Sequence, residues 1–160
     1  VMQQVYALTD AMYFGAVEAQ AASAELSALR EQAAKIQAQG PAAEALAAFV
    51  KKAAALEGQR PAAGAGGGRG AMGGGRGESA APAAPNSLWA VGASLASQMN
   101  AMQAADAAPT ANTLAAVTAA LNAADAVMAR WASLKSADLP ALNATLKAAG
   151  LSAIGGAPGR

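Results

Sequence analysis

The side chains in this 160-residue chain that could perform acid–base or metal chemistry are carboxylates, because the sequence contains no His and no Cys. The ten carboxylates are Asp10, Glu18, Glu25, Glu31, Glu44, Glu57, Glu78, Asp106, Asp125 and Asp138. Without His and Cys, the chain cannot use His-based catalysis, thiolates or disulfides, and nearly all zinc, haem and copper sites are excluded. A di-iron site of the kind found in helical bundles is also excluded, because it needs Glu-x-x-His motifs and the chain has no His. No base stands beside a Ser or Thr to activate it as a nucleophile. We therefore predict no catalytic, cofactor-binding or metal-binding residues.

A Gly-rich stretch holds two patterns that resemble binding motifs. The G-x-G-x-x-G pattern is met by Gly68, Gly70 and Gly73, but no strand precedes them and no helix starts on them, so we do not predict dinucleotide binding. The basic residues of the two Gly-Gly-Gly-Arg-Gly copies and their surroundings are Arg60, Arg69 and Arg76. They lack interleaved aromatic residues, which disfavours an RNA-binding segment. We interpret residues 58–86 as a flexible Gly/Ala/Pro-rich linker.

The composition favours a helical fold. Hydrophobic types make up 54% of the residues, and about a third of the chain is Ala, the best helix former. Aromatic residues amount to only 4%, and runs of β-branched residues are absent, which argues against a sheet. Charged residues are sparse at 13% with a net charge of +1, so we expect no nucleic-acid partner. No apolar run is long enough for a membrane span.

The first stretch organises the rest of the chain. Its apolar residues recur at steps of three and four and form one seam: Val5, Leu8, Met12, Gly15, Ala19, Ala22, Leu26, Leu29, Ala33 and Ile36. This spacing predicts a helix from Met2 to Gln39 whose seam other helices must cover. Further apolar bulk surrounds its N-terminal half at Tyr6, Tyr13, Phe14 and Val17. Either other helices of the same bundle wrap this half, which we favour, or it meets a domain outside this sequence.

The remaining helices follow from the same period. We expect helices at 41–56, 87–105 and 110–135, and a short one that Asp138 caps and Gly150 stops. Met99, Met102 and Met128 fit the core spacing, so we interpret them as core filler and not as ligands. The short connections predict antiparallel hairpins at 1–57 and 87–154, with the short helix folding back over the open end and a frayed tail at 155–160. The predicted fold class is an all-α antiparallel bundle of four main helices plus a short C-terminal helix.

Residues 104–151 carry an ordered set of features that resembles a known family. The set is Ala105-Asp106, Pro109-Thr110, Trp131, Leu134, the string Asp138-Leu139-Pro140-Ala141-Leu142-Asn143, and Ala149-Gly150-Leu151. It resembles the C-terminal helical region of bacterial sortilin-like β-propeller proteins, often labelled BNR-repeat glycosyl hydrolases. Leu29-Arg30-Glu31-Gln32 is similar to the first helix of that region. The resemblance implies an exported parent protein with N-terminal propellers. The Ser-x-Asp-x-Gly-x-x-Trp box of BNR repeats is absent, so no functional residue transfers.

Three functions stay open at this point. The leading one is a non-catalytic structural or interaction module of a larger exported propeller protein, with the propeller domains of the same chain as partner. In the second, the region contributes to a glycosyl hydrolase through polar residues such as Asp106 or Asn143. In the third, the Ala-rich seams cause self-association. Because the sequence opens on Val1 within a helical pattern, we interpret it as part of a longer chain.

Overall fold

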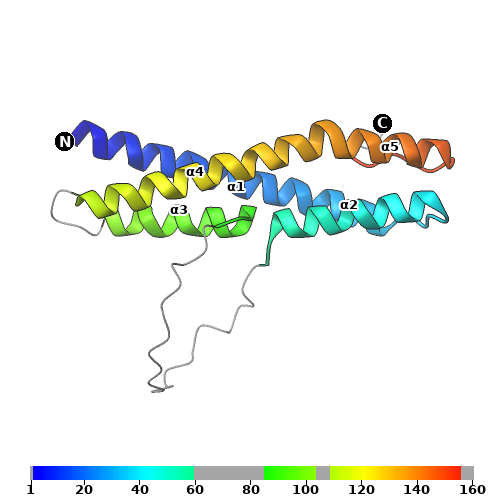
Figure 1. Ribbon diagram of the computed structural model, residues 1–160, viewed down its shortest axis with the longest axis horizontal. Helices are drawn as coiled ribbons and strands as arrows, with labels where there is room; N and C mark the ends of the chain where they lie inside the picture. The colour runs from blue at the N-terminus through cyan, green and yellow to red at the C-terminus, as the bar shows by residue number, and fades with distance from the viewer. Residues whose placement is uncertain (1, 60–84, 104–108, 156–160) are drawn as a thin grey trace, which may run out of the picture.

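The computed structural model describes residues 2–59, 85–103 and 109–155, and every regular element in these residues is a helix (Figure 1). The α-helices are α1 (Met2–Ala34), α2 (Pro41–Glu57), α3 (Leu88–Gln103), α4 (Ala111–Ser133) and α5 (Leu139–Ala148). A short π-helix, η1 (Leu134–Asp138), joins α4 to α5. The predicted class, an all-α helical bundle, is confirmed.

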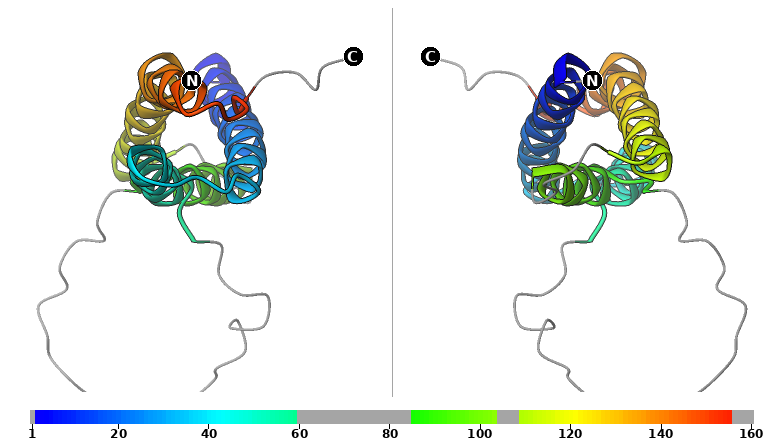
Figure 2. Two further views of the ribbon diagram at one scale, coloured as in Figure 1. Left: turned by 90° about the vertical axis from the view of Figure 1, so that its right-hand side faces the viewer. Right: turned by 90° about the vertical axis from the view of Figure 1, so that its left-hand side faces the viewer.

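The helices form an elongated bundle in which the two shorter helices α2 and α3 together span about the length of α1. Helix α1 runs along the bundle in one direction, and α2 and α3 return one after the other along its side (Figure 1). The rod of α4, η1 and α5 then runs back the length of the bundle, so that α1 packs against α3 and α4 in one half and against α2 in the other. The end-on views show the helices surrounding a common core (Figure 2). The antiparallel pairs α1/α2 and α3/α4 are those that short connections in the sequence predict, whereas α1 and α4, which are also in contact, run in the same direction (Figure 1).

The core lies where the seam spacing predicts it. On α1, the buried residues are Met12, Ala19, Ala22, Leu26, Leu29 and Ala33, and the predicted Val5, Leu8 and Ile36 pack against them. The other helices add Phe49, Leu56, Leu88, Val91, Leu95, Val117, Val127, Trp131, Leu142 and Leu146. Met102 is buried, and Met99 and Met128 pack against the core, which agrees with their interpretation as core filler.

Helix α1 ends earlier than predicted. The expected end was Gln39, whereas the helix stops at Ala34. The amides of Lys35 and Ile36 donate to carbonyls only three residues back, at 3.2 Å each, so the last turn tightens and the helical ladder ends. Residues 36–39 then reach Gly40 in a non-helical conformation, and Pro41 begins α2 where its missing N–H costs nothing.

The end of α2 and the start of α3 lie against each other. A Cβ atom built on Gly58 would fall 2.2 Å from the Ser87 hydroxyl oxygen. Ser87 is itself buried, and its Oγ accepts from the Ala90 amide at 3.3 Å, so Ser87 caps α3 at the predicted start of this helix. Gly58 and Ser87 therefore lie side by side at this end of the two helices. Most of the predicted linker, the end of the 87–105 helix, the turn at 106–108 and the tail after 155 lie outside the described residues.

The predicted break between the fourth and fifth helices, with Asp138 as a cap, is wrong. Thr110, expected as the first residue of the fourth helix, is the cap of α4, and its hydroxyl accepts from the Thr113 amide at 3.2 Å. Asp138 makes no side-chain capping bond, has helical backbone angles, and instead pairs with Lys52 at 2.6 Å. The chain continues from α4 into α5 through η1, in which the Leu139 amide donates to the Leu134 carbonyl. The short helix extends the rod over α2 and does not fold back.

The chain does fold back after Gly150. This residue has φ +73° and follows α5, as the predicted stop requires. The Leu151 amide donates to the Leu146 carbonyl at 2.9 Å and the Gly150 amide to the Lys147 carbonyl at 3.0 Å, which is a Schellman motif. The returning segment then buries Ile154.

Asn143 holds the returning segment in place. Its amide nitrogen donates to the Ile154 carbonyl at 2.9 Å, and its side-chain oxygen accepts from the Ile154 amide at 2.8 Å. Replacing Asn143 by alanine leaves both backbone groups of Ile154 without these partners, so we expect about 2 kcal/mol lower stability. Chemical denaturation followed by circular dichroism measures the loss. Asn122→Ala, at an exposed position of α4, should change stability by less than about 0.5 kcal/mol, and equal effects of the two substitutions would contradict this role.

Candidate interaction surface

The described carboxylates do not converge on one another. Three of them make ion pairs with basic residues: Glu57 with Arg30, Asp138 with Lys52 at 2.6 Å, and Glu25 with Lys135 at 3.4 Å. Asp125 is exposed, as are Asp10 and Glu18. Glu78 and Asp106 lie outside the described residues. The described acidic residues therefore serve as surface charges and ion-pair partners.

The residues proposed for other chemistry have structural roles where the structure describes them. Asn143 uses its amide on the backbone of Ile154, so its side chain is already engaged on both of its polar atoms. Among the described parts of the chain, no three acidic residues gather into a group that could hold a metal ion. None of the described helices has the length and hydropathy that crossing a membrane requires.

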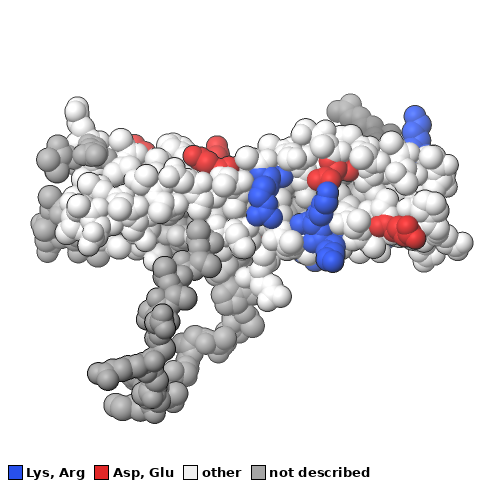
Figure 3. Space-filling model, in the orientation of Figure 1, with Lys and Arg blue, Asp and Glu red and all other residues white. Residues whose placement is uncertain are grey.

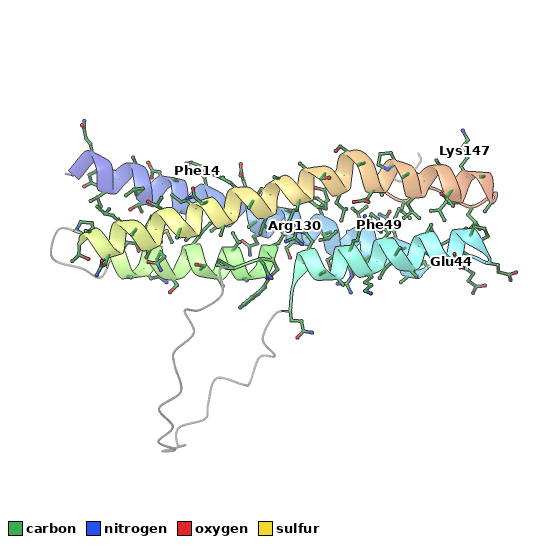
Figure 4. The ribbon with its side chains drawn as sticks, in the orientation of Figure 1. Phe14, Glu44, Phe49, Arg130 and Lys147 are labelled. Atoms are coloured by element: carbon green, nitrogen blue, oxygen red, sulfur yellow. The ribbon has the colours of Figure 1, made fainter. Side chains whose placement is uncertain are left out.

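An exposed apolar ridge is the feature of the surface that the bundle leaves without a partner. We define the aromatic ridge as Tyr6, Tyr13, Phe14 and Val17 of α1, whose exposed fractions are 63%, 54%, 62% and 44%. The Tyr13 and Phe14 rings meet edge to face with centroids 5.6 Å apart, so each steadies the other. Phe14 lies on the outside of α1, in contrast to Phe49, which points into the bundle (Figure 4).

The aromatic ridge corrects the interpretation that we favoured for this half of α1. We expected other helices of the bundle to wrap it, whereas α3 and α4 cover only the seam side. The reason is geometric. A three- or four-residue period can bury one stripe against two neighbouring helices, and none of the described helices covers the residues on the far side of α1. The alternative, that the ridge meets something outside this bundle, stays a hypothesis.

A groove between α1 and α3 lies directly beside the aromatic ridge. The α1–α3 groove has a volume of about 750 Å³, and Tyr13 and Val17 of the ridge form part of its wall. Its floor consists of small residues, among them Ala16, Ser23, Gly92 and Ala96, and Trp89 lines its opposite end. The aromatic ridge and the groove are thus one continuous surface.

Small residues explain why the groove forms. A Cβ on Gly15 would lie 3.0 Å from Leu95 Cδ1, and one on Gly92 would lie 3.9 Å from the Ala19 Cβ. Glycine and alanine at these crossings let the α1 and α3 backbones approach closely. Beside the crossings, side chains as small as those of Ala16 and Ala96 leave space that no residue of the bundle fills.

This half of the bundle also carries few charges. Helix α3 contains no charged residue, α4 contains none before Asp125, and the first half of α1 contains only Asp10 and Glu18. The described basic residues all lie elsewhere, and on the face shown in Figure 3 they gather from the middle of the bundle toward α5. Low charge beside exposed aromatic side chains is typical of the centre of a protein–protein interface.

The sequence pattern shows the ridge residues as extra apolar bulk on the first helix but does not identify them as a site. Nothing in the sequence indicated the groove. A second apolar stripe on α1 could have indicated the site, since Tyr6, Tyr13 and Val17 follow one another at steps of seven and four. The groove has no comparable signal, because its floor consists of Ala, Ser and Gly residues of the kinds that occur throughout the chain.

Comparisons with known proteins do not indicate what this surface binds. No known protein family, curated protein or solved structure matches the chain. The resemblance to the helical region of sortilin-like propeller proteins therefore depends on the residues quoted above alone, and it stays a hypothesis.

Proposed function

We propose that this chain is a non-catalytic helical interaction module and that the aromatic ridge with the α1–α3 groove is its binding surface. The observation that carries the proposal is the exposure of three neighbouring aromatic side chains beside an apolar groove, in the half of the bundle with few charges. Contiguous exposed apolar surface on this scale marks interaction sites in folded proteins. Aromatic residues are also those that dominate the energetics of interfaces.

The resemblance extends this proposal to the context of the module. A helical region at the end of an exported propeller protein would project from, or pack against, the propeller domains of the same chain. In that setting the bundle supplies binding, and any hydrolase activity belongs to the propellers. The sequence encoded upstream of Val1 tests this part, because it should contain the repeated strands of propeller blades. An upstream sequence without such repeats would remove it.

A photo-reactive cross-linker placed on the ridge tests the binding function. Phe14 is replaced by benzoylphenylalanine in the full-length gene product, expressed in its own host and irradiated. We expect cross-links to protein, because the Phe14 side chain lies within a covered interface in the assembled state. The control carries the same group at Lys147, an exposed position at the other end of the bundle (Figure 4). Cross-linking at position 14 that does not exceed the level at position 147 would refute an interaction surface.

A further inference from the structure

The aromatic ridge and the groove have complementary shapes, although both belong to one chain. Toward the N-terminus of α1 the wall of the groove is formed by large exposed side chains, Tyr13 and Val17. Toward the C-terminal half of α1 the same groove is lined by the small side chains of Ser23, Ala24 and Ser27. A surface with large side chains at one end and small ones at the other fits a copy of itself turned by a two-fold rotation.

We infer that two copies of this chain associate through this surface, with their α1 helices antiparallel and the ridge of each copy in the groove of the other. A two-fold axis at the level of Gln20 would bring Tyr13 of one copy to the level of Ser27 of the other. The groove at that level is also lined by Glu57, whose carboxylate can accept from the Tyr13 hydroxyl. This inference rests on the proposed function and names the partner of the binding surface.

The charges favour the antiparallel orientation. Asp10 lies on the ridge side of α1, and none of the described ion pairs includes it. In a parallel dimer the Asp10 carboxylates of the two copies would face each other. In the antiparallel dimer with its axis at Gln20 they lie about 30 Å apart along the helices. Like charges placed side by side in an interface are costly, so their separation favours the antiparallel orientation.

The available area is sufficient for a dimer. With about 200 Å² for an aromatic side chain, the exposed fractions of Tyr6, Tyr13 and Phe14 leave roughly 350 Å² of the ridge in water. In a two-fold symmetric contact each copy buries this area, so the total buried area is twice as large. The walls of the groove add further buried area. The total approaches the roughly 1,200 Å² at which stable interfaces begin, so we expect a dimer with micromolar affinity.

Sedimentation equilibrium of the 160-residue chain from about 1 to 500 μM tests the inference. We expect a monomer–dimer equilibrium. Val17→Glu should weaken it at least tenfold, because it places a charge where the ridge enters the partner's groove. The matched control, Ala119→Glu, adds the same charge at an exposed position of α4 and should leave the equilibrium unchanged. A monomer at every concentration would overturn the inference, as would equal weakening by both variants.

Engineered cysteines test the antiparallel arrangement without relying on affinity, because the natural chain has none. Gln20→Cys lies near the predicted axis at an exposed position and should form a disulfide-linked dimer under mild oxidation. A mixture of Tyr13→Cys and Ser27→Cys chains should form the mixed dimer in preference to either symmetric one. Random pairing would overturn the predicted contact. If the photo-cross-links at position 14 lead to another protein while the chain stays monomeric, the interaction function holds and the second copy as its partner does not.

Discussion

Replacing Trp131 by alanine should lower the free energy of unfolding by about 3–5 kcal/mol. The side chain lies on α4 within the central core, with only 4% of its surface exposed. Its removal leaves a cavity among residues of several helices, since a close-packed core relaxes only in part. The nearby Lys135 Nζ lies 5.0 Å from the ring centroid, so a cation–π contact is lost as well. Urea denaturation followed by circular dichroism at 222 nm gives the value without relying on tryptophan fluorescence.

Arg130→Ala provides the matched control for Trp131. Arg130 is the preceding residue on the same helix, but its side chain is exposed and donates one hydrogen bond to the Asn86 carbonyl at 2.8 Å. We expect this substitution to cost less than about 1 kcal/mol. Comparable losses for the two substitutions would mean that Trp131 does not belong to the core of the bundle.

Much of the fold could be predicted because it follows from local spacing. The seam of α1 and the helical period near Trp131 specify which face of each helix is buried, whatever the neighbouring helix is. The start of α3 after Ser87 and the stop at Gly150 also depend on nearby backbone groups alone. Such features involve residues within about one helical turn, so the sequence contains nearly all the information that they need.

The junction of α4 and α5 could not be predicted, because two outcomes share one sequence signal. Asp138 followed by Pro140 is typical of a new helix, since proline suits a first turn. Proline also fits within a continuing helix if the preceding turn widens, because its ring then avoids the carbonyl four residues earlier. The π-helix at Leu134–Asp138 supplies that wider turn. Packing of the extended rod against α2 favours the continuous form, and this packing is a tertiary effect that the local pattern does not contain.

The candidate surface could not be predicted from the sequence, for a different reason. Apolar side chains such as Tyr13 and Phe14 are read from a sequence as core, and only the arrangement of helices determines which of them lack cover. The expectation that no side chain acts in catalysis or metal binding depends on residue types alone, and it stays a prediction. The binding surface is a matter of shape, which requires that α1 and α3 be placed side by side.

Replacing Gly58 by alanine should destabilise the bundle by about 3 kcal/mol, because two separate costs meet at this residue. Its backbone, with φ +78° and ψ 178°, lies in a region that is essentially restricted to glycine and costs about 1–3 kcal/mol for other residues. The added Cβ would also fall 2.2 Å from Ser87 Oγ and 2.6 Å from Ser87 Cβ. Ser87 is buried and caps α3, so its displacement sacrifices the cap, which is worth about 1 kcal/mol. Thermal and urea unfolding of the variant measure the sum.

Gly40→Ala separates the two costs of the Gly58 substitution. Gly40 also has a positive φ, +57°, but a Cβ there meets no atom within 4 Å, so only the backbone strain applies. We expect Gly58→Ala to exceed Gly40→Ala by at least about 1 kcal/mol. Ser87→Gly in the Gly58→Ala background should recover part of that difference, because glycine removes the clashing side chain and remains tolerated at a cap position. Equal losses at the two glycines, with no recovery, would show that the ends of α2 and α3 do not touch and that Gly58 serves only its own turn.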